Sequence, residues 1–442
     1  MKFVKDNLFL IGLTLFSLFL YSIWAVVIPF NQAPDEFQRY DVADFIFKYH
    51  TLPVAGDNRL NYGVYGVTYA VFPYLTYIIG AIFMIFFDSI FDINNLYLVH
   101  RLVSVLSGAI SVCLVYKICE EMNFERNFNR FVSCLFAVIP GYSFVNSYVN
   151  QDSFSISVNL LIIYIWLRCL KSNWSSKNIF LLGIGLSLCL LTYMNGYVII
   201  PVTMLLLLRA YFSFPRKEFI KKIALLVIPI VIISGWWFVR SYVLYDGDVI
   251  GMKQNNMLSE QLAIEELKPS NRQTMDKQGV SMTEMIFDYQ WFSSTYKSFW
   301  GTFGYMDKWM DEKYYTTISV IHFISLIGCF FIIGRTLKKV FKKEKKIVDF
   351  LRDSTVHLLL LVLIFLSIAL SLYYSYFSDF QPQGRYIYPA IFPIILYFCL
   401  GLKEIVNNRF RGYIYTFSVL SMLFLNVYCL AKILIPSYYS GV

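Results

Sequence analysis

The chain has 442 residues, of which 57% are hydrophobic and only 15% are charged. Soluble domains carry about 25% charged residues, so this composition excludes an ordinary water-soluble protein. The formal charge of +9 is typical of basic cytoplasmic loops in a membrane protein, and we expect no nucleic-acid partner.

Apolar runs long enough to cross a bilayer recur along nearly the whole chain, since a span needs roughly 20 mostly apolar residues. The candidate spans are Leu8–Phe30, Leu98–Cys119, Phe131–Tyr148, Ser153–Leu170, Ile179–Met194, Val198–Phe212, Ile223–Tyr242, Thr317–Ile333, Thr355–Tyr376, Tyr388–Leu402 and Tyr413–Ile435. They predict an all-α polytopic membrane protein with about 11 transmembrane helices, in which residues 1–442 form a single integral membrane domain. The first run is too long for a signal peptide and is expected to be a retained anchor.

One further apolar stretch, Val67–Phe87, also suits a tilted or re-entrant segment because it contains Pro73 and Gly80. If it does not cross, most Lys and Arg residues fall in six cytoplasmic loops, as the positive-inside rule expects. If it crosses, the densest basic loop, Arg335–Arg352, faces outward. We therefore expect 11 crossings, a cytoplasmic N-terminus and an extracytoplasmic C-terminus, in the cell membrane.

Two segments on the extracytoplasmic side are then long. Residues 31–97 form the first, with a short interfacial helix expected at Asp41–His50. Residues 243–316 form the second, which is expected to be largely helical over Ser259–Leu267 and Met282–Trp300. Loops of this length are uncommon unless they are functional.

Other common chemistries lack sequence support. The eight cysteines lie in or beside apolar runs without C-x-x-C spacing, and the four histidines are scattered. Neither a disulfide framework nor a zinc site is indicated. Motifs for ATP hydrolysis, dinucleotide binding and zinc proteolysis are also missing from the sequence.

An acidic pair, Asp35-Glu36, follows Pro34 just beyond the first span. Carboxylates at the point where a hydrophobic helix surfaces are well placed to meet a lipid-borne polar substrate. Alternatively, Asp35 caps the helix that contains Asp41–His50, since Pro-Asp is common at a helix start. Both roles are compatible.

Several motifs, taken in order, resemble the GT-C superfamily of membrane glycosyltransferases, and within it a family of bacterial membrane proteins of the DUF2142 type. The motifs are Pro34-Asp35-Glu36-Phe37-Gln38-Arg39-Tyr40, Arg101-Leu102-Val103-Ser104, Asn150-Gln151-Asp152, Trp236-Trp237-Phe238-Val239-Arg240, Ser298–Gly304 and Gln383-Gly384-Arg385-Tyr386. Two positions depart from the family pattern. Arg39 stands where the first box commonly has histidine, and Tyr193 lies where many relatives have lysine.

The resemblance implies hexosyl or pentosyl transfer from a polyprenyl-phosphate donor to an envelope glycan or lipid-linked acceptor, outside the cytoplasm. Such transfer needs a base for the acceptor hydroxyl, countercharge for the leaving phosphate, and a groove for the lipid. Asp35 is the candidate base, with Glu36 as the substitute. We expect partial desolvation to raise the pKa of Asp35 and to make it a better proton acceptor.

Arg385 is the first candidate for donor phosphate, because guanidinium groups bind phosphate oxygens bidentately. Arg240 and Arg101 are the second and third. Each has a simpler alternative: Arg385 pairs with Asp379 or a lipid phosphate, and the others only place a charge at a span end. We also expect Gly384 to let backbone amides approach a ligand.

Further candidates complete the predicted site. Asp152 is expected to bind the acceptor or a metal, or else to cap the next span. Trp300, Tyr386 and Tyr40 are candidate contacts for sugar or lipid. No cofactor is firmly implied. The alternative is a divalent cation (Mg²⁺ or Mn²⁺) shared by Asp152 and Asp35, which would need more oxygen ligands than these two carboxylates supply.

Two rival functions are a transporter or flippase of lipid-linked saccharide, and a non-catalytic partner in envelope assembly. Transporters favour polar and broken helices at the membrane midplane, often in repeated halves. The informative charges here lie at span ends, and no halves repeat.

Overall fold

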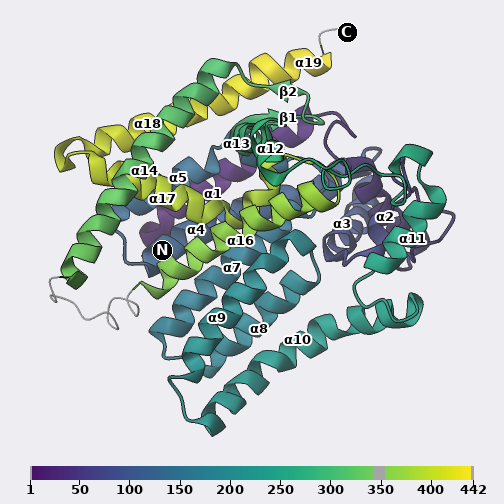
Figure 1. Ribbon diagram of the computed structural model, residues 1–442, viewed down its shortest axis with the longest axis horizontal. Coiled ribbons are helices and arrows are strands. Elements are labelled where there is room, and N and C mark those ends of the chain that lie inside the picture. The colour runs from purple at the N-terminus through teal and green to yellow at the C-terminus, as the bar shows by residue number, and fades with distance from the viewer. Residues whose placement is uncertain (1, 342–353, 440–442) are drawn as a thin grey trace.

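The computed structural model describes residues 2–341 and 354–439, and most of these residues are helical (Figure 1). The longer helices are α1 (Lys2–Val27), α4 (Leu96–Glu121), α7 (Asp152–Lys171), α10 (Arg216–Leu244), α14 (Glu312–Phe341), α16 (Thr355–Phe377) and α18 (Arg411–Tyr428). The shorter ones are α2 (Glu36–Tyr49), α3 (Leu75–Phe91), α5 (Arg126–Ala137), α6 (Pro140–Val145), α8 (Ser176–Leu190), α9 (Ile199–Tyr211), α11 (Met252–Leu262), α12 (Met282–Phe287), α13 (Trp291–Gly301), α17 (Ile391–Ile405) and α19 (Ile435–Tyr439).

Short turns and one hairpin complete the fold. The 3₁₀ turns are η1 (Tyr69–Val71), η2 (Met194–Val198), η3 (Glu265–Leu267), η4 (Gly384–Ala390) and η5 (Asn408–Phe410), and a π-helical turn, Cys429–Leu434, joins α18 to α19. Strands β1 (Thr302–Phe303) and β2 (Lys308–Trp309) pair antiparallel, with Thr302 opposite Trp309.

Nine helices in the described part of the chain are long and apolar enough to cross a membrane, and each falls on a predicted span. The prediction of an all-α polytopic membrane protein is confirmed. The other two predicted spans differ. Phe131–Tyr148 is divided into α5 and α6 around Pro140, because proline cannot continue the helical hydrogen bonds. Ile179–Met194 falls on α8, which has only 15 residues.

The loops predicted to be cytoplasmic lie together at one end of the bundle. Lys171 forms a salt bridge of 2.8 Å with Glu121, and Lys403 one of 2.6 Å with Glu125. The first contact joins the ends of α4 and α7, and the second joins the start of α5 to the end of α17. The basic loop Arg335–Arg352 lies mostly outside the described residues.

Helix α3 begins and ends at the opposite end of the bundle. The Leu75 amide donates to the Leu191 carbonyl over 3.1 Å, just after α8 ends. A short turn then leads from the end of α3 to Leu96, where α4 begins. The stretch Val67–Phe87 therefore forms η1 and a helix that does not run from one end of the bundle to the other.

The centre of the bundle is the packing of α4 against α7. Small residues let the two backbones approach closely, as in other membrane helix pairs. Ser157 donates to the Ser107 carbonyl over 2.5 Å, and its hydroxyl lies 2.8 Å from that of Ser111. This packing brings the first turns of α4 and α7, which carry Arg101 and Asp152, to the same end.

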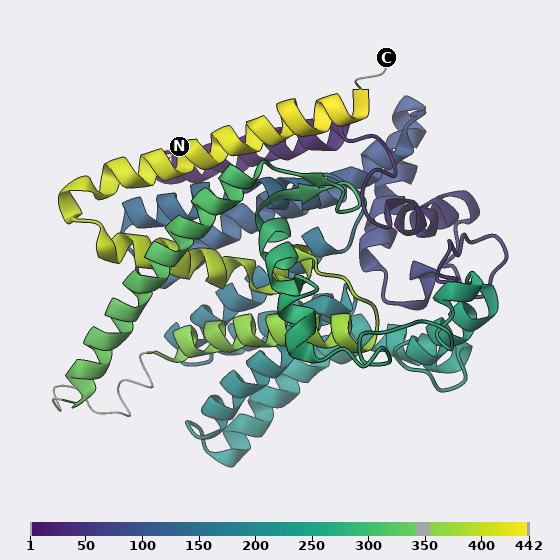
Figure 2. The same ribbon diagram turned by 45° about the horizontal axis from the view of Figure 1, so that its top comes forward.

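The C-terminal helix covers α1, as Figure 2 shows for the yellow and purple segments. Asn426 accepts a hydrogen bond of 3.0 Å from the Trp24 indole, and the Tyr439 hydroxyl donates to the Val27 carbonyl over 3.0 Å. Together with Tyr438, which donates to the Gln32 carbonyl, these contacts hold the segment that leads from α1 to Asp35.

Candidate active site

Asp35 occupies the N-cap position of α2 with a positive φ of 61°, but its side chain makes no capping hydrogen bond. Aspartate tolerates this left-handed conformation better than most residues. Its carboxylate lies 3.5 Å from the Arg39 guanidinium and 3.6 Å from that of Arg385. The side chain is 45% exposed, so a substrate can approach it. The position therefore matches the predicted cap, while the carboxylate is directed to two arginines.

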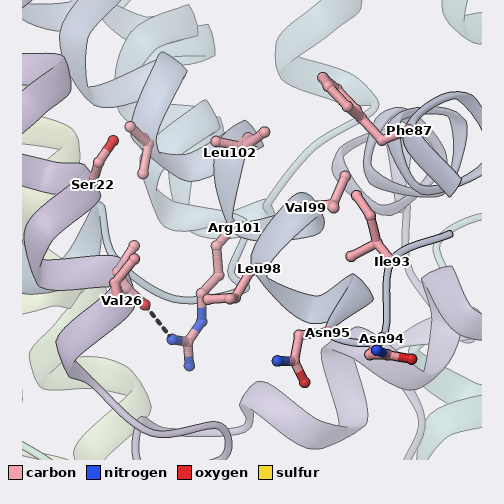
Figure 3. Close-up of a pocket in the computed structure, with 12 residues that line it drawn as sticks. Ser22, Val26, Phe87, Ile93, Asn94, Asn95, Leu98, Val99, Arg101 and Leu102 are labelled. Carbon is pink, nitrogen blue, oxygen red and sulfur yellow. Dashed lines mark hydrogen bonds between the residues drawn. The ribbon is translucent and has the colours of Figure 1, made fainter. Parts of the chain in front are cut away.

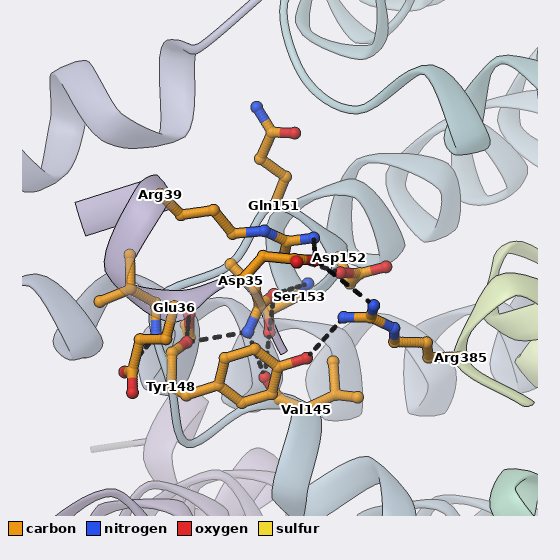
Figure 4. A network of polar contacts seen from close by, with 12 residues as sticks. Asp35, Glu36, Arg39, Val145, Tyr148, Gln151, Asp152, Ser153 and Arg385 are labelled. Carbon is orange, nitrogen blue, oxygen red and sulfur yellow. Dashed lines mark hydrogen bonds and ion pairs between the residues drawn. The ribbon is translucent and has the colours of Figure 1, made fainter. Parts of the chain in front are cut away.

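Arg39 lies one helical turn after Asp35 and joins it to Asp152 (Figure 4). Its guanidinium contacts the Asp152 carboxylate at 3.3 Å and donates to the Tyr69 hydroxyl over 3.4 Å. Asp152 is the first residue of α7 and follows the N-cap, Gln151. Its carboxylate is thus engaged by Arg39, which differs from the alternative expectation of a helix cap.

Arg385 reaches the same cluster from η4 and is buried. Its guanidinium donates to the Gln383 side chain over 2.7 Å, to the Tyr148 hydroxyl over 3.2 Å and to the Tyr386 hydroxyl over 3.4 Å. The alternative partner, Asp379, instead accepts a hydrogen bond from Gln381. The predicted phosphate ligand and the predicted base are therefore in contact with each other.

Gly384 has a packing role in the structure. Its amide donates to the Ser298 hydroxyl over 2.6 Å, so that amide is not free for a ligand. A Cβ atom at this position would lie 2.2 Å from the backbone nitrogen of Phe299. The glycine is needed because η4 packs directly on α13.

The charge balance of the cluster sets the ionisation of Asp35. Burial by itself would raise the pKa of its carboxyl, but the neighbouring cations Arg39 and Arg385 and a hydrogen bond with Tyr69 outweigh this effect. The net result is a pKa below the usual aspartate value, because nearby positive charge favours the ionised form. The expectation of a raised pKa is therefore wrong in sign.

Glu36 and Arg101 form a separate, fully buried pair. The Arg101 guanidinium donates twice to the Glu36 carboxylate, at 2.8 Å each. Its remaining N–H groups go to the carbonyls of Ala25, Ile28 and Pro29. An arginine has five N–H donors, so Arg101 has none left for a phosphate.

The carboxylate of Glu36 is equally occupied, since it also accepts from the backbone amides of Asn31 and Val149 at 2.8 and 3.0 Å. Because the carboxylate is fully buried and both of its oxygens already accept hydrogen bonds, it cannot meet an acceptor hydroxyl in this arrangement. The pair joins the end of α1, α2 and α4. We therefore interpret Glu36 and Arg101 as structural, which corrects both predicted roles.

Of the remaining predicted residues, Tyr386 lies in the cluster, and Arg240, Tyr40 and Trp300 make other contacts. Tyr386 belongs to the cluster, because its hydroxyl contacts Arg385 and Gln381. Arg240 instead donates to the Pro53 carbonyl over 2.8 Å. Tyr40 packs against Phe30 and His100. Trp300 has no exposed surface, so a sugar could contact it only after a rearrangement.

The described part of the chain contains no preformed binding site for a divalent cation. No three His, Cys, Asp or Glu side chains gather there in a way that could hold a metal. Arg39 contacts both Asp35 and Asp152, the two carboxylates that a cation would have to share. These residues do not fit a metal in their present arrangement.

An apolar pocket of about 530 Å³ adjoins the buried pair (Figure 3). It opens between α1, α3 and α4, and most of its lining is apolar, including Val26, Phe87 and Leu102. Arg101 forms part of its wall, and the same side chain pairs with Glu36, the residue that follows Asp35.

Comparisons with known proteins agree with this architecture. A family model described as "Predicted membrane protein (DUF2142)" matches residues 30–394. No curated protein matches the sequence. Among solved structures, the oligosaccharyltransferase of Archaeoglobus fulgidus in its apo form is similar, with a TM-score of 0.51 and 13% identity over 98% of this chain and 56% of that chain. Its complex with Zn and sulfate gives a TM-score of 0.52 and 14% identity over 95% and 52%.

ArnT from Cupriavidus metallidurans bound to undecaprenyl phosphate has a TM-score of 0.47 and 12% identity, over 98% of this chain and 74% of that chain. This chain spans about half the length of the oligosaccharyltransferase. The likeness to that enzyme confirms the GT-C-like fold that the sequence motifs predict.

Proposed function

This chain belongs to the DUF2142 family of predicted membrane proteins, and from that premise we propose that it is a membrane glycosyltransferase. It would move a sugar from a polyprenyl-phosphate donor to a cell-envelope glycan or lipid-linked acceptor on the extracytoplasmic face. The GT-C-like fold supports glycosyl transfer. The observation that carries the proposal is the 3.6 Å contact between Asp35 and Arg385 in a partly exposed cluster.

The two residues divide the work of the reaction. Arg385 holds the donor phosphate, and the Asp35 carboxylate takes the proton of the acceptor hydroxyl. The acceptor oxygen then bonds to the anomeric carbon, the bond from that carbon to the phosphate oxygen breaks, and its electron pair leaves with the phosphate. Attack from the side opposite to the leaving phosphate inverts the anomeric centre.

The donor itself would make Asp35 a better base. In the free protein Arg39 and Arg385 lower the pKa of this carboxyl, and an ionised group of low pKa is a weak proton acceptor. A phosphate bound to Arg385 adds negative charge near Asp35, which raises the pKa of the carboxyl. The carboxylate would thus gain basicity only when the donor is in place.

Arg39 and Asp152 are proposed positioning residues. Arg39 is nearly fully buried and links both carboxylates, so it fixes where the Asp35 carboxylate lies. Asp152 offsets the second positive charge. The apolar pocket between α1, α3 and α4 is proposed to receive the hydrocarbon chain of a lipid-linked substrate.

A transfer assay tests the proposal. Purified protein in lipid nanodiscs is given radiolabelled polyprenyl-phosphate sugars and envelope acceptors, and wild type is compared with Asp35→Asn. Transfer by the wild type that Asp35→Asn loses supports the assignment. Equal transfer by both proteins removes the assignment. A wild-type protein that moves lipid-linked sugar across a vesicle membrane without transferring the sugar favours the flippase instead.

The proposed face of the membrane has a separate test. Asn61 is exposed near the cluster and Ser176 is exposed at the opposite end. In a cysteine-free background, Asn61→Cys should react with a membrane-impermeant maleimide in intact cells, whereas Ser176→Cys should react only after lysis. The reverse pattern places the cluster in the cytoplasm and contradicts the proposal.

A further inference from the structure

A second pocket lies at the opposite end of the bundle from Asp35, between the first turns of α5 and α18. Its volume is about 640 Å³. Its lining includes the polar residues Glu125, Arg130, Arg411 and Tyr415 and the apolar residues Phe131, Cys134, Val419 and Leu420. The proposed glycosyl transfer makes no use of this pocket.

The pocket lining carries two positive charges, Arg130 and Arg411, and one negative charge, Glu125. Glu125 is already paired with Lys403 at 2.6 Å. Arg411 uses its Nε to donate to the Lys403 carbonyl over 3.0 Å. The Arg130 guanidinium lies 4.7 Å from the centre of the Phe9 ring, and a contact of this kind leaves its N–H groups available.

Two buried polar atoms at the pocket have no hydrogen-bond partner among the described residues, namely the Tyr415 hydroxyl and the Arg130 Nε. Tyr415 is only 7% exposed, and its ring is stacked on Phe131 with 4.3 Å between centroids. An unpaired buried polar group costs about 1–3 kcal/mol. A ligand with several acceptor oxygens would satisfy both atoms.

The apolar lining of the pocket meets the outer surface of α18 at Leu420. Tyr413, Phe417, Leu420 and Phe424 are all more than half exposed, and their spacing of three or four residues places them on one face of the helix. Leu420 belongs both to this face and to the pocket wall. In a membrane-spanning helix such a face meets hydrocarbon, so a group in the pocket has acyl chains as natural neighbours.

We propose that this pocket binds the headgroup phosphate of an anionic phospholipid. The phosphate oxygens accept hydrogen bonds from the Arg130 and Arg411 guanidinium groups and from the Tyr415 hydroxyl. The acyl chains lie along the exposed face of α18. The proposal does not depend on glycosyl transfer, because none of these residues belongs to the Asp35 cluster.

Native mass spectrometry of the full chain tests this site, with phosphatidylglycerol as the probe and phosphatidylcholine as the neutral comparison. We expect phosphatidylglycerol to be retained in preference to phosphatidylcholine. Tyr415→Phe removes only the hydroxyl and keeps the ring stacked on Phe131, and Arg411→Gln removes one charge. Each should weaken phosphatidylglycerol binding about tenfold, since a hydrogen bond to a charged group contributes about 1.5–3 kcal/mol.

The matched control is Arg409→Gln, because Arg409 is exposed on the same turn but does not line the pocket. It should bind phosphatidylglycerol like the wild type. The melting temperature of Tyr415→Phe in phosphatidylcholine alone should not fall, which separates lost binding from lost folding.

Four results would overturn the proposal. They are equal retention of the two lipids, wild-type binding by Tyr415→Phe, an equal loss in Arg409→Gln, and displacement of phosphatidylglycerol by millimolar inorganic phosphate. The last result would identify a site for a soluble phosphate compound in place of a lipid.

Discussion

The Asp35 carboxylate and the Arg385 guanidinium lie 3.6 Å apart although they come from opposite ends of the sequence. Asp35 follows the first membrane helix, and Arg385 is the second residue of η4, the 3₁₀ turn that leads into α17. The exposed edge of the cluster belongs to the acid, while the arginine is nearly buried. In the proposed reaction a substrate would therefore meet the carboxylate first, and the guanidinium would have to move to bind the donor phosphate.

Replacing Asp35 with asparagine should remove catalysis while leaving donor binding largely intact. The amide keeps the shape of the side chain but cannot take the acceptor proton, and loss of a positioned base costs about 10²–10⁴-fold in rate. Steady-state transfer kinetics measure this as a fall in kcat with little change in the KM for donor. Asp44→Asn is the control, because Asp44 lies on the same helix and forms its salt bridge with Lys48, outside the cluster. An equal loss in the control would point to helix α2 as a whole.

Changes at Arg385 should appear first in donor binding. Arg385→Ala removes the phosphate ligand and should raise the KM for donor about tenfold or more, since hydrogen bonds to charged groups contribute about 1.5–3 kcal/mol. Arg385→Lys keeps the charge but not the bidentate geometry, so it should recover only part of the binding. Equilibrium binding of a fluorescent polyprenyl phosphate provides the measurement. Unchanged affinity in Arg385→Ala would contradict the assignment.

Substitutions in the Glu36–Arg101 pair should lower the stability of the fold and leave the rate of the chemical step unchanged. Both side chains are almost fully buried, and removing one partner of such a pair costs about 3–5 kcal/mol because the other charge is left unpaired. Glu36→Gln and Arg101→Met should therefore lower the melting temperature and the yield of folded protein. The protein that does fold should keep its kcat. A catalytic role for Glu36 would instead give a stable but inactive variant.

The apolar pocket beside this pair predicts a dependence on lipid chain length. Ser22 lines the pocket on α1, and Ser22→Trp should fill much of its volume. If a substrate chain lies there, the KM should rise for long polyprenyl donors or lipid-linked acceptors, and less for short-chain analogues. Phe19→Trp is the matched control, because Phe19 is exposed on the same helix and does not line the pocket. Equal kinetics in all three proteins would remove the pocket from the proposal.

The sequence predicts the helices well and the site only in part. Apolar runs determine the spans because hydrocarbon admits little else, but Pro140 divides one predicted span. The motifs identify Asp35, Arg385 and Asp152, yet Arg39, Tyr69 and Tyr148 were not predicted as site residues. Only the i, i+4 spacing of Asp35 and Arg39 at a helix start points to one of these contacts.

Tyr69 and Tyr148 come from distant segments, and tyrosines are so frequent in this chain that composition does not single them out. The sequence also did not predict that Glu36 and Arg101 form a buried pair with each other. Their difference from Asp35 and Arg385 lies in burial and in the number of occupied donors, and both depend on how α1, α2 and α4 pack. By charge alone Glu36 resembles Asp35 and Arg101 resembles Arg385, and all four residues lie near the end of a predicted span.

The pH dependence of the two kinetic parameters should differ. In the free protein the pKa of Asp35 lies below its usual value because Arg39 and Arg385 outweigh the effect of burial. The carboxylate is therefore ionised above about pH 4, the usual aspartate value. Since kcat/KM reports the free enzyme and kcat reports the substrate complex, the acid limb of kcat/KM should lie below about pH 4.

The acid limb of kcat should lie at higher pH, because donor phosphate on Arg385 raises the pKa of Asp35 in the complex. Transfer rates measured at saturating and at low donor concentration across the acid range separate the two limbs. Arg385→Lys should bring them closer together, since a less well placed phosphate perturbs the carboxyl less. If both limbs coincide in the wild type, the donor does not change the basicity of Asp35, and the carboxylate must act at the low pKa that the two arginines impose.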